Sequence, residues 1–201
     1  MTGDKITNIK GVGEKRARLF EKLGVCSVDA LLHFYPRNYI DYSRITPIDS
    51  TVIGETACVK ATVVTKPIEY RVRKGMTLYK FTASDGHMPL KVTIFNNKYL
   101  AAKINAGDIY IFYGKVDGNL LRREMASPEI LPPSKATIRP VYRQTEGLHS
   151  YMIEQAVSQA LNNAVIKEYL PDRIREKYNL CSLKQALHNI HFPTDFAALN
   201  T

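Results

Sequence analysis

An alternation of apolar and polar residues runs through the middle of the chain, in short stretches separated by turn residues. A period of two places apolar side chains on one face of a β-strand, and short strands joined by turns are typical of a small antiparallel barrel or sandwich. The turns contain Asp85-Gly86 and Asp117-Gly118-Asn119, which suit tight hairpins. The pattern predicts five strands, approximately at Ala57 to Lys66, Met76 to Ser84, Met88 to Phe95, Asp108 to Val116 and Leu120 to Met125.

A short helix is predicted between the third and fourth strands, from Asn97 to Ile104, and Gly107 closes it. Five strands with a helix in this place follow the order of an OB-fold, a Greek-key barrel whose strand face and loops bind single strands. If the strand count is wrong by one, another small β-barrel becomes an alternative. We therefore expect an α+β fold: a five-stranded antiparallel OB-fold β-barrel flanked by N-terminal and C-terminal helical segments.

Helical periodicity precedes and follows the strands. Leu19, Leu23 and Leu31 mark an apolar stripe before Pro36, and Pro132-Pro133 separates the strands from a second helical region. That region carries apolar stripes at Ile153, Val157, Ala160 and Leu161, and at Ile174, Tyr178, Leu183, Leu187 and Ile190. The predicted organisation is a helical segment at 1–50, an OB-fold domain at 51–134 and a helical support segment at 135–201.

Positive charge is concentrated in the predicted barrel. The chain has 28 Lys and Arg against 19 Asp and Glu, and residues 51–135 hold 13 basic and 7 acidic residues. This excess predicts a polyanionic partner, because basic side chains on phosphates release counterions. No apolar stretch is long enough for a membrane helix, and three widely spaced cysteines indicate neither a disulfide framework nor a metal site. A reducing cytoplasm fits best.

The segment Lys10-Gly11-Val12-Gly13 resembles the turn of a helix-hairpin-helix motif. Glycine permits a close approach of the backbone to a phosphate, and the amides at the start of the next helix favour an anion. Gly11, Gly13 and Lys15 are therefore candidate phosphate contacts. The alternative, equally open from the sequence, is that the turn only packs two helices together.

Strand parity separates the side chains around Phe95. Leu90, Val92 and Ile94 share one face and are expected in the core, so Phe95 shares the other face with Lys91 and Thr93. Tyr99 follows four residues later, beside Lys98. Two aromatics next to lysines are typical of non-sequence-specific strand binding. The alternative is that Phe95 closes the end of the barrel.

Further basic residues are expected at hairpin tips. A loop predicted at Tyr70 to Gly75 carries Arg71, Arg73 and Lys74, and the last strand carries Arg122 and Arg123. These side chains are candidate contacts to the DNA backbone, with ordinary solvated tips as the alternative. Catalytic and metal-binding constellations are not apparent, and Gly114-Lys115 is followed by Val116 rather than completing a P-loop. We therefore expect no cofactor and no covalent chemistry from these residues.

In their order, these motifs resemble the N-terminal wedge region of the RecG family, bacterial ATP-dependent DNA helicases that reverse stalled replication forks. The resemblance covers nearly the whole chain and depends on the following segments: Lys10-Gly11-Val12-Gly13, Leu31-Leu32-His33-Phe34-Tyr35-Pro36-Arg37-Asn38-Tyr39-Ile40-Asp41, Ser84-Asp85-Gly86, Phe95-Asn96, Glu124-Met125, Pro128-Glu129, Pro140-Val141-Tyr142, Thr145-Glu146-Gly147-Leu148 and Leu187-His188-Asn189-Ile190-His191-Phe192-Pro193.

The resemblance implies a wedge that separates the arms of a replication fork or Holliday junction during fork reversal, branch migration, DNA repair and recombination. Phe95 and Tyr99 match the stacking aromatics of that family, and Asn96, Asn97 and Lys98 lie in the same wedge segment. Two alternatives stay open. One is a free-standing OB-fold protein that binds single-stranded nucleic acid, and the other is a purely structural interaction module.

The family's two motor domains, with their P-loop, would begin after Phe192-Pro193, whereas the sequence ends at Thr201. The resemblance therefore implies that ATP and Mg²⁺ act only in motor domains outside this sequence, and that those domains are partners of the wedge. It further implies branched DNA and a single-stranded-DNA-binding protein as partners, a monomer, no membrane association, and a bacterial, nucleoid-associated location in the cytoplasm.

Overall fold

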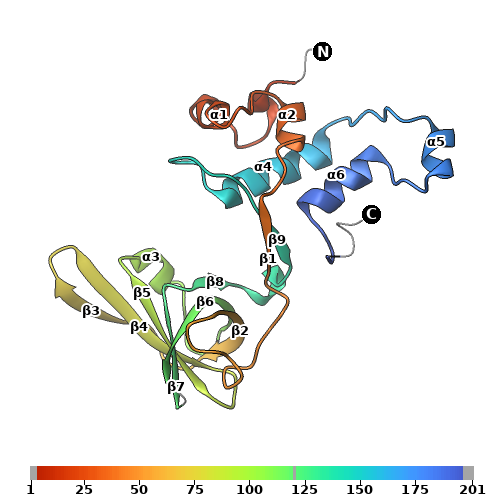
Figure 1. Cartoon of the computed structure of the whole chain (residues 1–201). Helices are drawn as coiled ribbons and strands as arrows, with labels where there is room; N and C mark the ends of the chain where they lie inside the picture. The colour runs from red at the N-terminus through yellow and green to blue at the C-terminus, as the bar shows by residue number, and fades with distance from the viewer. Residues whose placement is uncertain (1–3, 120, 197–201) are drawn as a thin grey trace. The chain divides into compact units, whose positions relative to one another are not determined.

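The computed structural model describes residues 4–119 and 121–196, and the chain divides into two compact units (Figure 1). The barrel unit is the continuous stretch Asp41–Thr137, and the helical unit combines Met1–Ile40 with Ile138–Thr201. The stretch from Asp41 to Ser50, placed with the N-terminal helices by the sequence pattern, lies in the barrel unit. The reason is that Ile48 is fully buried in the barrel core.

Five strands of the barrel unit form a closed OB-fold. They are β2 (Thr56–Val63), β4 (Met76–Ser84), β5 (Pro89–Phe95), β6 (Ile109–Asn119) and β7 (Arg122–Ala126). The pairing order is β2-β4-β5-β7-β6, and β6 pairs back with β2 to close the barrel. Only the β5–β7 pair among these is parallel. The short helix α3 (Lys98–Ala101) lies between β5 and β6, so the predicted OB-fold is confirmed.

Alternation along the strands builds the barrel core. Leu90, Val92 and Ile94 of β5 are buried, as parity predicts, and they pack with Phe81 of β4 and Phe112 of β6. Each of these strands is therefore defined by one apolar face.

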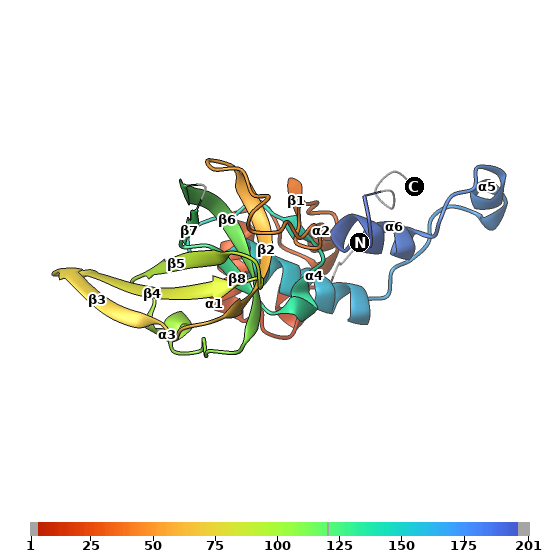
Figure 2. The ribbon, with the colours of Figure 1, turned by 90° about the horizontal axis from the view of Figure 1, so that it is seen from below.

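Two further strands were missed in the sequence. The segment predicted as a basic loop is β3 (Ile68–Arg73), which pairs with β4 in a hairpin that reaches beyond the other barrel strands (Figures 1 and 2). Its sequence, Ile68-Glu69-Tyr70-Arg71-Val72-Arg73, does alternate between apolar and charged residues, but the run of basic residues before Gly75 was interpreted as a loop, and all six side chains are exposed. The second, β8 (Glu129–Leu131), is short and pairs with β6.

The predicted turn at Asp117-Gly118-Asn119 lies within β6. Gly118 pairs with Arg123 at a positive φ of 109°, and an added Cβ there would lie 2.1 Å from the Arg122 carbonyl oxygen. Only glycine fits this close approach between the two strands. Leu120, where the fifth strand was predicted to begin, lies outside the described residues.

The helical unit has one core formed from both ends of the chain. Its helices are η1 (Ile6–Asn8), α1 (Glu14–Glu21), α2 (Val28–Leu32), α4 (Ser150–Asn163), α5 (Asp172–Lys177) and α6 (Leu183–His191). Phe20 and Leu31 from the N-terminal part pack in the same cluster as Ile153 and Leu187 from the C-terminal part. The stripe predicted at Ile174 and Tyr178 differs, because both side chains are exposed.

A short sheet and a buried polar contact tie the two chain ends together. Strand β1 (Asn38–Asp41) pairs with β9 (Ile138–Val141), and η2 (Pro133–Lys135) precedes β9. His191 is fully buried; its Nε2 lies 2.8 Å from the Leu32 carbonyl oxygen, and its Nδ1 lies 2.9 Å from the Tyr142 hydroxyl. Since a carbonyl only accepts, Nε2 donates and Nδ1 accepts from Tyr142. Burial lowers the pKa of His191, which keeps the ring neutral.

Candidate nucleic-acid interface

Two aromatic side chains are exposed at the corner where β5 leads into α3. Phe95 ends β5 and is 39% exposed, whereas Tyr99 in the first turn of α3 is 86% exposed. The predicted outward direction of Phe95 is confirmed, because its strand neighbours Leu90, Val92 and Ile94 face the core. Exposed aromatic rings of this kind are available to stack on bases.

Two asparagines hold this corner in place. Asn96 adopts a left-handed conformation with φ of 50°; its backbone amide donates to the Thr77 carbonyl, and its side-chain oxygen accepts from the Thr77 amide at 2.8 Å. The side-chain oxygen of Asn97 caps α3 by accepting from the Leu100 amide at 2.9 Å. The side-chain oxygens of these candidate DNA contacts thus fix the backbone on which Phe95 and Tyr99 stand.

Exposed lysines lie beside the aromatics. Lys91 is on the outward face of β5, four residues before Phe95, and Lys98 begins α3 next to Tyr99. Both predicted contacts are therefore accessible to phosphates. An aromatic pair flanked by cations can bind a single strand through stacking and charge together.

The cations of the β3–β4 hairpin differ in availability. Arg71 forms an ion pair with Glu69 at 2.9 Å, and this hydrogen bond lowers the pKa of Glu69 and raises that of Arg71. Arg73 and Lys74 are exposed at the tip. The tip of the hairpin therefore offers Arg73 and Lys74 for phosphate contact, while the charge of Arg71 is offset by Glu69.

The two arginines of the last strand differ in accessibility: the contact predicted for Arg122 stays a prediction, whereas the one predicted for Arg123 is wrong because this side chain is buried. Arg122 is half exposed and pairs with Glu124 at 2.5 Å. Arg123 is only 4% exposed, and its guanidinium donates to Thr51 Oγ1 and the Thr51 carbonyl at 3.2 Å and to the Asn119 carbonyl. It stabilises the barrel instead of facing DNA. Parity could have shown this, because Arg123 shares the face of the buried Met125.

The N-terminal hairpin packs as a structural turn and keeps a basic rim. Its apolar residues Ile6, Ile9 and Val12 are buried in the helical core. Gly11 has a φ of 89° and its carbonyl accepts from Arg16 at 2.7 Å, while Gly13 caps α1. Lys15 is exposed. The packing role of the turn is thus established, and Gly11, Gly13 and Lys15 stay predictions as phosphate contacts.

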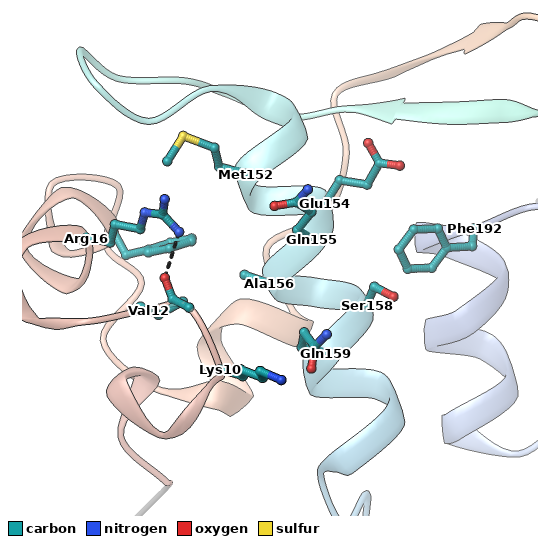
Figure 3. A pocket seen from close by; sticks show the side chains of 12 residues that line it. Lys10, Val12, Arg16, Met152, Glu154, Gln155, Ala156, Ser158, Gln159 and Phe192 are labelled. Carbon is teal, nitrogen blue, oxygen red and sulfur yellow. Dashed lines mark hydrogen bonds between the residues drawn. The ribbon is translucent and has the colours of Figure 1, made fainter. Parts of the chain in front are cut away.

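A pocket of about 380 Å³ lies beside this hairpin, within the helical unit (Figure 3). Lys10 and Arg16 line one side, and Gln155 and Gln159 of α4 line the other. Glu154 at its edge is already paired with Arg139 of β9 at 2.5 Å. The cations and amides favour a polar or anionic group, but no side chain in the pocket points to a particular ligand.

Residues 4–119 and 121–196 contain no group of three or more His, Cys, Asp or Glu placed to hold a metal ion. Among the same residues, no helix combines the length and the apolar character that crossing a bilayer requires.

Known proteins match this architecture closely. The RecG wedge domain family matches residues 5–164. ATP-dependent DNA helicase RecG of Thermotoga maritima is 30% identical over 198 residues, covering 93% of this chain and 25% of that protein, and the Streptococcus pneumoniae RecG is 30% identical with 92% and 28% covered. The chain thus spans about a quarter of the length of these relatives.

A solved structure of RecG bound to a three-way DNA junction superimposes with a TM-score of 0.89. Its sequence is 28% identical, and the match covers 100% of this chain and 28% of that one. The fold, the family match and these relatives agree over nearly all described residues. The chain therefore belongs to the RecG wedge domain family.

Proposed function

We propose that this chain binds branched DNA and acts as the wedge of a RecG-type ATP-dependent DNA helicase. The observation that carries the proposal is the pair Phe95 and Tyr99, exposed at one rigid corner of an OB-fold and flanked by Lys91 and Lys98. Its family relatives are DNA helicases, and one was solved on a three-way DNA junction. At such a junction, the rings of Phe95 and Tyr99 would stack on bases at the point where the strands separate.

In this proposal, stacking on bases provides affinity that does not depend on sequence, and the basic side chains provide salt-dependent contacts to phosphates. Base–aromatic stacking contributes about 1 to 3 kcal/mol per base and tolerates any sequence, which suits a wedge that meets every sequence. Lys91, Lys98, Arg73 and Lys74 would contact phosphates and make binding sensitive to salt, and Arg122 would contribute less because Glu124 offsets its charge. The same holds for Arg71, because Glu69 offsets its charge.

We further propose that, in the complete protein, motor domains bind ATP and Mg²⁺ and pull DNA across the barrel. This movement would drive fork reversal and Holliday-junction branch migration during DNA repair and recombination. The described wedge residues would perform no covalent step and hold no cofactor. We further propose a monomer in the bacterial cytoplasm, close to the nucleoid, that meets a single-stranded-DNA-binding protein at stalled forks.

Fluorescence anisotropy of this chain with a model fork, an equal-length duplex and a single strand, each at two salt concentrations, tests the proposal. We expect the fork to bind tightest and its affinity to fall as salt rises. Equal affinity for fork and single strand would favour a generic OB-fold binder, and no binding to any DNA would contradict the proposal.

The stacking assignment has its own test, the double variant Phe95→Ala, Tyr99→Ala. We expect fork affinity to fall at least about tenfold, which corresponds to about 1.4 kcal/mol and is modest for two lost stacking contacts. Tyr169→Ala is a matched control, because this exposed tyrosine lies in the helical unit. Wild-type fork affinity in the double variant, with the fold intact by circular dichroism, would show that the aromatics do not stack on DNA.

A further inference from the structure

A row of three apolar side chains crosses the outward face of the barrel unit. It runs from the β3–β4 hairpin to the corner where β5 leads into α3, which we call the wedge corner. In the strand register, Tyr70 of β3 lies opposite Leu78 of β4, and Leu78 lies opposite Phe95 of β5. Residues directly opposite in antiparallel strands project to the same face and lie close enough for their side chains to touch. Tyr70 and Phe95 are therefore the two aromatic ends of one row.

The row is accessible along its length. Tyr70 is 48% exposed, Leu78 is half-buried, and Ile68, on the same face as Tyr70, is exposed. Adjacent strands are about 4.8 Å apart, so the two aromatic positions are separated by roughly 10 Å. Leu78 lies between them and gives the space an apolar floor.

The charges around this row suit an anionic chain. Lys80 lies opposite Ile68 and places its ammonium 5.6 Å from the centre of the Tyr70 ring. Among the described outward residues that the register places around the row on β3, β4 and β5, two are lysines and none is acidic: Ile68, Tyr70, Leu78, Lys80, Thr82, Lys91, Thr93 and Phe95.

The carboxylate of Glu69 lies on the opposite face of the hairpin from the row. Glu69 pairs with Tyr79 across the strands, and Tyr79 belongs to the core face; Glu69 also bonds Arg71 there. Its negative charge is therefore separated from the row and offset by Arg71. On the outward face, Glu124 of β7 lies opposite Lys91, and its charge is offset by Arg122 at 2.5 Å. A strand of nucleotides along the row would therefore meet aromatic surface and positive charge.

We propose that Tyr70 is a further base-stacking residue and that the Tyr70–Leu78–Phe95 row forms a second nucleotide subsite for the unpaired DNA strand leaving the wedge corner. The inference rests on the proposed branched-DNA function. Phe95 and Tyr99 cover the bases at the point of separation, and Tyr70 holds a base further along the same strand. Lys80 positions the tyrosine ring and contacts a neighbouring phosphate.

The roughly 10 Å between the two aromatic positions gives the proposal a length signature. A base on Tyr70 and a base on Phe95 cannot be stacked on each other, because stacked neighbours along a strand are only about 3.4 Å apart. An unpaired arm of several nucleotides is needed to occupy both places. A junction whose arms are fully paired has no strand that reaches Tyr70.

The test compares Tyr70→Ala and Tyr70→Phe on two DNAs: a fork with an unpaired arm of about 10 nucleotides, within the site size of OB-folds, and a junction with fully paired arms. On the unpaired arm, Tyr70→Ala should bind about five- to tenfold more weakly in anisotropy measurements, and Tyr70→Phe should bind like wild type. Both variants should match wild type on the paired junction. Tyr169→Ala serves as the matched control. Thermal unfolding checks that the two Tyr70 variants are as stable as wild type.

The outcomes separate this inference from the proposed function. If Tyr70→Ala binds the unpaired arm like wild type while Phe95→Ala binds it more weakly, the second subsite is refuted and the wedge function stands. A loss that is equal on both DNAs, or a loss that Tyr70→Phe does not restore, would show that the ring does not act by stacking. If wild type itself shows no preference for branched DNA, both proposals fall.

Discussion

The two units of this molecule obtain their cores in opposite ways. The barrel unit is one continuous stretch, Asp41–Thr137, and the strand pairings of its barrel sheet all join residues within that stretch. The helical unit joins two ends separated by that whole stretch, and Leu31 packs in the same cluster as Ile153. The barrel can therefore complete its core from one continuous stretch of about 100 residues, whereas the N-terminal helices depend on a partner more than 100 residues away.

The buried hydrogen bonds of the two units differ in the same way: those of the barrel join residues of one continuous stretch, and those of the helical unit together link both ends of the chain. In the barrel, Arg123 binds Thr51 and Asn119, all within the continuous stretch. In the helical unit, His191 of α6 binds Leu32 of α2 and Tyr142, and so joins both ends of the chain. The two units should consequently respond separately to truncation, to core substitution and to pH.

Truncation after Thr137 should produce the largest difference. This change removes α4 and α6, so Phe20, Leu31 and their neighbours lose the surface against which they pack, and helices as short as α1 and α2 are unstable alone. We expect amide hydrogen exchange to show full loss of protection in α1 and α2 with the barrel amides still protected. The stretch 41–137 alone is the control; persistent protection in α1 and α2 would contradict the dependence.

Matched leucine truncations should separate the units next. Leu31 and Leu90 are both fully buried, the first in the helical core and the second in the barrel core. Each Leu→Ala change should cost about 3 to 5 kcal/mol. Residue-resolved hydrogen exchange should place each loss in the unit that carries the substitution. Leu121→Ala, at an exposed site, is the control, and an equal loss of protection in both units would show that they unfold as one.

The adjacent arginines of β7 test the barrel alone. Arg123→Gln should destabilise it by about 1 to 3 kcal/mol, because buried carbonyl and hydroxyl groups lose their donors. Arg122→Gln should leave stability nearly unchanged and weaken salt-dependent DNA binding slightly. Denaturant unfolding and anisotropy measure both variants. The reverse order, with Arg122 needed for stability and Arg123 for DNA, would contradict the assignment.

How much the sequence revealed depends on how local the signal was. The five OB strands could be predicted because strands such as β5 alternate buried Leu90, Val92 and Ile94 with exposed residues. The hairpin strand β3 was missed although Ile68, Tyr70 and Val72 alternate with charged residues, because the run of basic residues before Gly75 was interpreted as a loop. Its pairing with β4 alone, with every side chain exposed, could not be predicted from that alternation. The shared helical core also escaped prediction, since apolar periodicity shows which face of a helix is buried and not which distant segment covers it.

The candidate site shows the same limit. Parity predicted that Phe95 faces outward, and the structure confirms its exposure. Parity applied to β7 would also have removed Arg123, which alternates with exposed Arg122 and lies on the side of Met125. The row from Tyr70 to Phe95 could not be predicted, because it exists only through the register of three strands, one of which was read as a loop.

The smallest expected effect is a difference in acid sensitivity. Burial is the main cause that lowers the pKa of His191 below its usual 6.5, with an electrostatic contribution from the neighbouring His33 and His188, although the hydrogen bond to the Leu32 carbonyl opposes this. Its contribution to the helical unit is fully present above pH 6.5 and is lost as the pH falls through the lowered value. Protonation would also remove the acceptor that Nδ1 offers to Tyr142.

In the barrel, Asp85 accepts from the amides of Ile48, His87 and Met88. Burial acts to raise the pKa of Asp85, but these hydrogen bonds outweigh it and lower the pKa below 3.8, so this contribution is lost only in stronger acid. From pH 7 to 5, hydrogen exchange should thus show weakening of the helical unit alone. His191→Phe should remove that dependence, and His87→Gln, at an exposed site, should keep it. Equal weakening of the barrel over this range would mean that the two units are coupled.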